Sequence, residues 1–224
     1  MMNEIVAFQL IIVRHGESYG NIGADCNFPK DDPGLTPIGF LQAKLTGDRL
    51  AMGKIDAFFS SPLTRALQTA QMIVDQRTDS LKIHCLADLM ETDTTPGFTG
   101  CDKEKIDKSF PDVLLESLPT KTGGGLSLQQ EDNTDKFNRA VRVIDYLKNT
   151  YSNGETVVLV THATFTKFLL RAALGLSADE IFRFSEDNCS LTKVKFYKNH
   201  LNKLSYSNDI SHLYSFYPQK TFTI

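Results

Sequence analysis

The stretch that decides the fold is Ile11–Ser18, with the sequence IIVRHGES. Residues from Ile5 to Val13 are mostly bulky or β-branched, so they predict a buried strand. Arg14 and His15 follow at the carboxyl end of this strand, which is where open α/β sheets bind their ligands. A guanidinium group beside an imidazole at such an edge suggests an oxyanion site with a nucleophile inside it.

The overall composition is that of an ordinary globular protein. Of 224 residues, 41% are hydrophobic and 23% are charged. The formal net charge of −3 gives no general attraction to nucleic acid or to an anionic membrane, so an anion must be bound by a local cluster. The sequence has no apolar run near the ~18 residues of a membrane span and no signal-peptide pattern. Four scattered cysteines without a C-x-x-C pair fit a reducing compartment better than a disulfide framework or zinc site. We therefore expect a cytoplasmic protein that binds neither nucleic acid nor membrane.

Strand and helix patterns alternate along the chain. Further strands are predicted at Ile55–Phe59, Leu81–Leu86, Thr156–Val160, Leu191–Tyr197 and Leu201–Ser207. Helices are predicted at Thr36–Met52, Ser61–Gln76, Asn133–Asn149, Thr164–Leu174 and Ala178–Phe184. In the first two helices, Thr36-Pro37 and Ser61-Pro62 each resemble an N-cap followed by proline. This order predicts an α/β fold, with a mainly parallel central sheet, helices on both faces and antiparallel edge strands near the C-terminus.

One long segment interrupts the alternation. From Glu91 to Gln130 the periodicity is weak, and the segment contains three prolines and the run Gly123–Gly125. So long an irregular segment in a compact domain is usually a lid or a binding loop. We expect a single domain over residues 1–224, with a cap-like insertion at about 92–130.

Chemically useful side chains follow the predicted strands. Arg14 and His15 end the first strand, and Arg65 lies in the first turn of the helix after the second. Glu91 follows the third strand, and His162 ends the fourth. Taken singly, each has an ordinary explanation as a surface or strand-terminal group. Parallel strands bring their carboxyl ends to one edge, so we expect all five side chains to meet there.

Five motifs together resemble the histidine phosphatase superfamily, which is also called the phosphoglycerate mutase-like superfamily. In chain order they are RHGES with Asn21, LTxxGxxQA from Leu35, SSPxxRAxxTA from Ser60, Glu91 before GFTG from Gly97, and VLVTH from Val158. They cover nearly the whole chain in the order that the family uses.

The resemblance implies hydrolysis of a small phosphomonoester through a phosphohistidine intermediate on His15. The attacking nitrogen must be unprotonated, and the like charges of Arg14 and Arg65 should lower the imidazole pKa. The other ring nitrogen is expected to donate to a backbone carbonyl, which fixes the tautomer.

The resemblance also implies roles for the remaining site residues. The phosphoryl oxygens would be bound by Arg14, Asn21, Arg65, His162 and the Ala163 N–H, with further amides from the helix that follows. Glu91 would protonate the leaving oxygen and later take a proton from water. Asp93 is a rival for this role, because the span from Glu91 to Gly97 is about one residue longer than usual. No metal or other cofactor is expected, since the cations are built into the chain.

Two alternatives stay open. Mutases of the family have a longer chain with additional basic and tyrosine residues in the insertion, and that pattern is not found here, so hydrolysis is favoured over phosphoryl return. A catalytically silent domain that binds phosphate would need neither His15 nor Glu91. The expected partner is a small phosphorylated metabolite. The oligomeric state is left open, a homodimer included.

Overall fold

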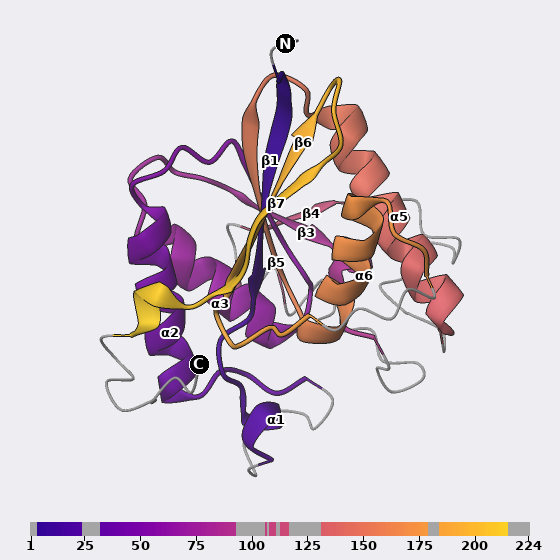
Figure 1. The fold of residues 1–224 in the computed structure, drawn as a ribbon. Helices are drawn as coiled ribbons and strands as arrows, with labels where there is room; N and C mark the ends of the chain where they lie inside the picture. Colours follow the sequence, from indigo (N-terminus) through magenta and orange to yellow (C-terminus); the bar gives the residue numbers. More distant parts are fainter. Residues whose placement is uncertain are drawn as a thin grey trace.

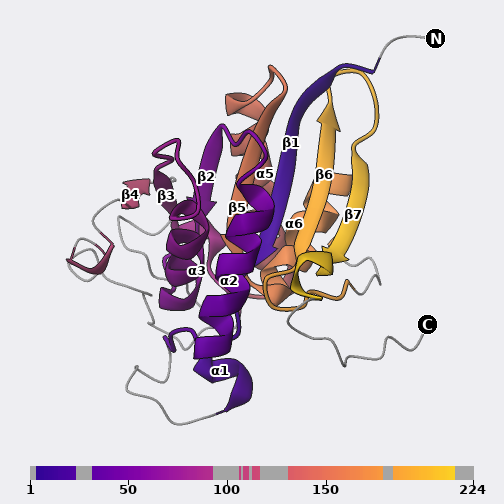
Figure 2. The ribbon, with the colours of Figure 1, turned by 90° about the vertical axis from the view of Figure 1, so that its left-hand side faces the viewer.

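The computed structural model describes residues 4–23, 32–92, 106, 108–110, 113–116, 131–178 and 184–214. One seven-stranded sheet runs through the molecule (Figure 1), with the strand order β4-β3-β2-β5-β1-β6-β7 (Figure 2). The strands are β1 (Val6–Arg14), β2 (Ala57–Ser60), β3 (Ile83–Leu86), β4 (Val113–Glu116), β5 (Glu155–Thr161), β6 (Leu191–Tyr197) and β7 (Lys203–Asp209). Strands β1 to β5 pair in parallel, whereas β6 and β7 are antiparallel at one edge. The predicted fold class is confirmed.

Helices cover both faces of this sheet. Figures 1 and 2 show α2 and α3 on one face and α5 and α6 on the other. The helices are α1 (Tyr19–Ile22), α2 (Pro37–Leu50), α3 (Thr64–Val74), α5 (Asn133–Thr150) and α6 (Ala163–Leu174), with short 3₁₀ turns η1 (Ala87–Leu89) and η2 (Ser211–Leu213). None of the helices in the described ranges has the length and apolar character that crossing a membrane requires.

The apolar run Leu10–Val13 of β1 reflects burial on both sides. Phe8, Leu10 and Ile12 point into the core beneath α5 and α6. Ile11 and Val13 belong to the core on the α3 side. Since strand side chains alternate between faces, only a central strand with two covered faces needs every position apolar. The centre of the sheet thus fixes the position of Arg14 and His15.

The loop after β1 is locked against the start of α2. Thr36 caps α2 as predicted, because its hydroxyl accepts from the Gly39 N–H at 3.0 Å and Pro37 is the first helical residue. The Thr36 N–H donates in turn to the Glu17 carbonyl at 2.9 Å. A Cβ on Gly39 would lie 2.0 Å from the same Glu17 oxygen, so only glycine permits this approach. This contact holds the residues that directly follow His15.

Three local features differ from the sequence prediction. Helix α1 is not among the predicted helices, because with four residues it is too short to show a helical period. Strand β4 lies within the predicted insertion and pairs with β3; it also has four residues. The N-cap residue of helix α3 is Leu63 and not Ser61, because Ser61 contacts a residue of the candidate site described below. Most of the insertion, and residues 179–183 of the predicted helix at 178–184, lie outside the described residues.

Candidate active site

The predicted side chains meet at the carboxyl edge of the parallel strands. His15 directly follows β1, and His162 directly follows the adjacent strand β5. Their imidazole rings lie 5.1 Å apart between centroids, at an angle of 57°. Arg65 lies in the first turn of α3, the helix that follows β2, and its side chain contacts His15. The structure therefore brings together side chains that are up to 147 positions apart in sequence (His15 to His162).

His15 is held through both ring nitrogens. Its side chain is buried, with 3% exposure. Nδ1 lies 2.7 Å from the Gly16 carbonyl oxygen, which can only accept, so Nδ1 carries the proton. The Nε–H of Arg65 donates to Nε2 at 3.3 Å, so Nε2 presents its lone pair. This tautomer leaves Nε2 as the nucleophilic atom, and the backbone contact is the one that the sequence predicted.

Both site histidines are kept neutral. Burial, followed by the charges of Arg65 and Arg14, holds the pKa of His15 well below its usual range. Burial, followed by Arg65, lowers the pKa of His162 in the same way. A buried imidazolium beside two guanidinium groups would be poorly solvated and repelled. Neutral imidazoles are therefore the stable form near neutral pH.

His162 has one satisfied nitrogen and one without a partner. Nε2 lies 2.8 Å from the Ser61 hydroxyl, which also accepts from the Leu63 N–H at 3.3 Å. When the Ser61 proton points to Nε2, the ring proton is on Nδ1. Within the described part of the chain, this buried Nδ1 has no hydrogen-bond partner. Buried polar atoms are rarely left unpaired, so Nδ1–H is a candidate donor to a bound anion.

Arg14 is anchored at one end and open at another. One terminal nitrogen donates to the Glu186 carbonyl at 2.5 Å, whereas the buried Nε has no partner among the described residues. Burial lowers the pKa of Arg14, partly opposed by the charge of Glu91. An arginine remains charged even so. The arrangement leaves a second unsatisfied donor beside His15.

The start of α3 positions Arg65 in an unexpected way. The Asp32 carboxylate accepts from the Thr64 N–H at 2.7 Å and from the Thr64 hydroxyl, so it caps the helix from a distant segment. Ser61, predicted as the cap, instead bonds His162. The prediction of a Ser61 cap was therefore wrong, because a tertiary contact supplied the capping oxygen. Burial lowers the pKa of the neighbouring Arg65, and the charge of Asp32 partly opposes this lowering.

Glu91 lies at the N-terminus of α6. Its carboxylate accepts from the Phe165 N–H at 3.0 Å and from the Thr164 N–H at 3.3 Å. The charge of Glu91 raises the pKa of both Arg14 and Arg65, so Glu91 belongs to the same cluster as His15. The amides expected to bind an anion are thus partly used by Glu91. Among the first three N–H groups of this helix, only that of Ala163 has no partner in the described residues.

Asn21 is at the margin of the cluster. Its side-chain oxygen accepts from the Ser18 N–H at 3.0 Å, from the Ser18 hydroxyl at 3.1 Å and from the Asn188 amide at 3.2 Å. The residue is exposed, and its oxygen is committed to the start of α1. Its NH₂ group is the part that can still donate to a ligand, and the expected contact with the phosphoryl oxygens stays a prediction. Asp93, the rival to Glu91, lies outside the described residues.

Several residues that shape the site were not found from sequence. Asn188 donates to the His15 carbonyl at 3.0 Å, and the Cys189 N–H donates to the Arg14 carbonyl at 3.0 Å. Arg139 holds the turn before Glu91. The sequence signal for Asn188 is weak, since a polar residue before a strand is ordinary. The signal for Arg139 is stronger, because a cation falls on the mainly apolar stripe of α5.

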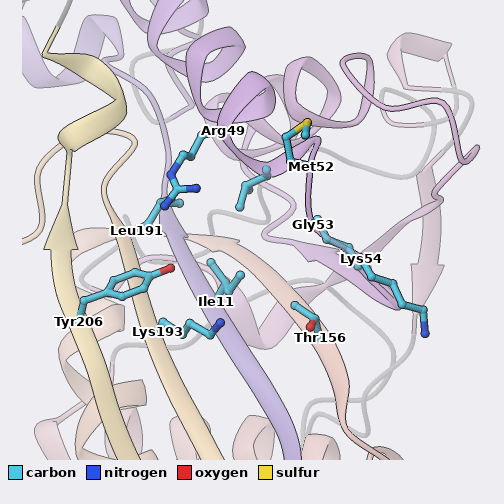
Figure 3. Close-up of a pocket in the computed structure, with 11 residues that line it drawn as sticks. Ile11, Arg49, Met52, Gly53, Lys54, Thr156, Leu191, Lys193 and Tyr206 are labelled. Carbon is cyan, nitrogen blue, oxygen red and sulfur yellow. The ribbon is translucent and has the colours of Figure 1, made fainter.

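The described residues include an open pocket elsewhere in the molecule. It has a volume of about 450 Å³ and lies beside Ile11 on β1, between the end of α2 and the edge strands (Figure 3). Arg49, Lys193 and Tyr206 are among its lining residues. None of the predicted site residues lines it, so this pocket is not the candidate active site.

The described residues also hold no cluster of three or more His, Cys, Asp or Glu side chains placed to bind a metal ion.

Comparisons with known proteins agree with this arrangement. The sequence model described as histidine phosphatase superfamily (branch 1) matches residues 10–209. The bifunctional protein Rv2228c of Mycobacterium tuberculosis is 29% identical over 209 residues, covering 92% of this chain and 55% of that protein. Phosphoserine phosphatase 1 of Hydrogenobacter thermophilus is 28% identical over 214 residues, covering 93% of this chain and 96% of its own. This chain thus spans about half the length of the mycobacterial relative but nearly all of the second.

A solved structure shares the fold. The phosphoserine phosphatase mutant of Entamoeba histolytica, crystallised with phosphoserine, superposes with a TM-score of 0.62 at 23% identity. The match covers 92% of this chain and 99% of that one. At this identity the likeness concerns the arrangement of the elements.

Proposed function

This chain belongs to branch 1 of the histidine phosphatase superfamily, and from that premise we propose that it hydrolyses a small phosphomonoester through a phosphohistidine on His15. The observation that carries the proposal is the state of His15 Nε2. This atom is unprotonated and faces the guanidinium of Arg65. A lone pair held beside fixed positive charge is suited to attack a phosphorus atom whose oxygens bind those charges.

The first chemical step breaks the bond between phosphorus and the ester oxygen. Nε2 of His15 forms the new bond to phosphorus, while Nδ1–H stays bonded to the Gly16 carbonyl and spreads the developing positive charge. Arg14 and Arg65 would bind the equatorial oxygens, where charge accumulates in phosphoryl transfer. The open donors at Arg14 Nε and His162 Nδ1 support this role, because a bound phosphoryl group would satisfy both.

Glu91 is the proposed acid and base. Its carboxyl group gives a proton to the leaving oxygen, then takes one from the water that attacks the phosphohistidine. Its position supports this assignment, because it lies close to both site arginines while the α6 amides fix the direction of its carboxyl group. Release of inorganic phosphate returns His15 to its starting state. The proposed steps draw their positive charge from arginine and their protons from Glu91, so they need no metal.

The experiment is a phosphatase screen over several dozen phosphorylated metabolites, run with a chelator present. Phosphoserine belongs in the panel, since two of the similar proteins carry that substrate in their names. We expect phosphate release from at least one small monoester, and none from the His15→Ala variant. Isomerisation of phosphoglycerate without net phosphate release would make the protein a mutase instead. Tight phosphate binding with no turnover across the panel would make it a binding domain.

A further inference from the structure

Arg139 is the largest side chain that is fully buried in the described residues, and the proposed mechanism does not use it. It lies on α5, whose buried stripe is otherwise mainly apolar. An arginine is costly to remove from water unless each of its donors finds a partner. Its contacts therefore show what it is there to hold.

The first set of contacts is to the turn before Glu91. One terminal nitrogen of Arg139 donates to the Asp88 carbonyl at 2.8 Å and to the Met90 carbonyl at 2.7 Å. The Thr161 hydroxyl donates to the intervening Leu89 carbonyl at 2.8 Å. Three successive carbonyls that precede Glu91 are thus fixed by side chains.

The second contact is to the residue that binds the Glu91 carboxylate. The guanidinium carbon of Arg139 lies 4.0 Å from the centroid of the Phe165 ring, over its face. The backbone N–H of the same Phe165 donates to Glu91 at 3.0 Å. Arg139 therefore touches both the backbone that carries Glu91 and the residue that orients its carboxylate.

The third contact fixes Arg139 itself. Its remaining donors form a two-point ion pair with Glu131, at 2.8 Å and 2.7 Å. The Glu131 side chain is 13% exposed, so the pair is largely shielded from water. A planar guanidinium can serve the two carbonyls and the carboxylate at once, whereas a lysine ammonium cannot match this geometry.

We propose that Arg139 is a positioning residue for the acid of the proposed reaction: it sets the direction of the Glu91 carboxyl group through the Asp88–Met90 backbone and the Phe165 ring. This inference rests on the proposed function. A displaced acid impairs protonation of the leaving oxygen, and displacements of about 1 Å can cost two orders of magnitude in rate. The loss should fall on substrates whose leaving group needs that proton.

The test compares Arg139→Lys with wild type on alkyl phosphates and on aryl phosphates with acidic leaving groups. We expect kcat/KM to fall about 10-fold or more for the alkyl esters and less than about 3-fold for the aryl esters. In a Glu91→Gln background the same substitution should have almost no further effect on alkyl esters, because the two residues act through one proton transfer.

Arg142→Lys is the matched control. Arg142 lies on the same helix and pairs with the Asp88 side chain at 3.3 Å, but it has no recorded bond to the carbonyls that precede Glu91. It should leave both classes of substrate unchanged. Should Arg139→Lys fold poorly, Glu131→Gln weakens the same ion pair with little change in volume and should give the same selectivity on a smaller scale.

Equal losses on alkyl and aryl esters, or losses that multiply with those of Glu91→Gln, would reduce Arg139 to a general structural role. A readout without turnover separates this inference from the proposed function. The Thr164 and Phe165 amide protons, which bond Glu91, should exchange faster with solvent in Arg139→Lys than in Arg142→Lys. Unchanged exchange would overturn the positioning role, even if no substrate of the enzyme were found.

Discussion

His15 and Glu91 are both held by hydrogen bonds, yet the bonds come from different distances along the chain. His15 takes its tautomer from Gly16, the next residue, and its position from the end of β1. Glu91 takes its direction from Thr164 and Phe165, more than 70 positions away in sequence. The position of the proposed nucleophile thus depends mainly on its own strand, whereas that of the proposed acid depends on how α6 packs. Changes remote from β1 should therefore damage the His15 side little unless they remove a side chain that bonds His15, such as Arg65, whereas changes in the packing of α6 should damage the Glu91 side.

The strongest way to test the nucleophile side is His15→Ala. Removing the attacking atom should lower kcat by roughly 10⁴-fold or more. Incubation with a ³²P-labelled substrate, followed by rapid denaturation, should trap labelled wild-type protein and no labelled variant. Near-normal turnover in the variant would show that the nucleophile lies elsewhere.

Glu91→Gln tests the acid side. The amide keeps the shape of the carboxyl group but cannot give up a proton, so alkyl phosphates should lose about 10² to 10⁴-fold in kcat/KM. Aryl phosphates with acidic leaving groups should lose far less. The measurement is the dependence of kcat/KM on leaving-group pKa, which should steepen in the variant. If both classes decline together, Asp93→Asn is the next variant to examine.

Arg65→Gln probes the charge that keeps His15 neutral. Removal of a nearby cation takes away one cause of the lowered pKa, so the His15 pKa should rise. The nucleophile would then be protonated at a higher pH, and the acid limb of the kcat/KM profile should move to higher pH. The rate at the optimum should also drop about 10²-fold, since a donor to the phosphoryl group is lost. Arg49→Gln, at an exposed position outside the site, should leave the profile where it was.

Asn188→Ala should have the smallest effect. It removes one hydrogen bond to the His15 carbonyl and one to Asn21. Loss of about 1 kcal/mol corresponds to a several-fold decrease in kcat/KM. Asn149→Ala, an exposed change on α5, provides the baseline for a harmless asparagine substitution. A decrease beyond 100-fold would mean that Asn188 meets the substrate directly.

The same contrast explains what could be predicted from sequence. The strands ending in Arg14-His15 and in His162 were predictable, because buried apolar runs mark parallel strands and parallel strands share an edge. The proximity of Arg65 and Glu91 to these histidines was also predictable, because each follows a strand that was expected to be parallel. Helix α2 was predictable down to its Thr36 cap, since that cap is local.

The remainder depended on contacts that no local pattern encodes. Asp32 replaces Ser61 as the cap of α3, and that choice requires knowing which loop packs against the helix. Strand β4 is too short for a period, and its pairing with β3 makes it a strand. Two of the acceptors of Arg139 are backbone carbonyls, which carry no sequence signature of their own. Tertiary partners therefore had to come from the structure.

The Arg139 contacts also bear on protein engineering. Met90 and Glu131 are bonded to one guanidinium, so the chain leaves and rejoins the core within the reach of a single side chain. With both anchor points fixed, each doubling of the intervening length costs only about 0.6 kcal/mol of closure entropy. An exchange of residues 93–130 for a segment of another length would have to keep β4, which pairs with β3, and the buried Ile106 and Phe110. A library of such chimeras, screened on a panel of phosphomonoesters, would test whether this insertion determines substrate choice.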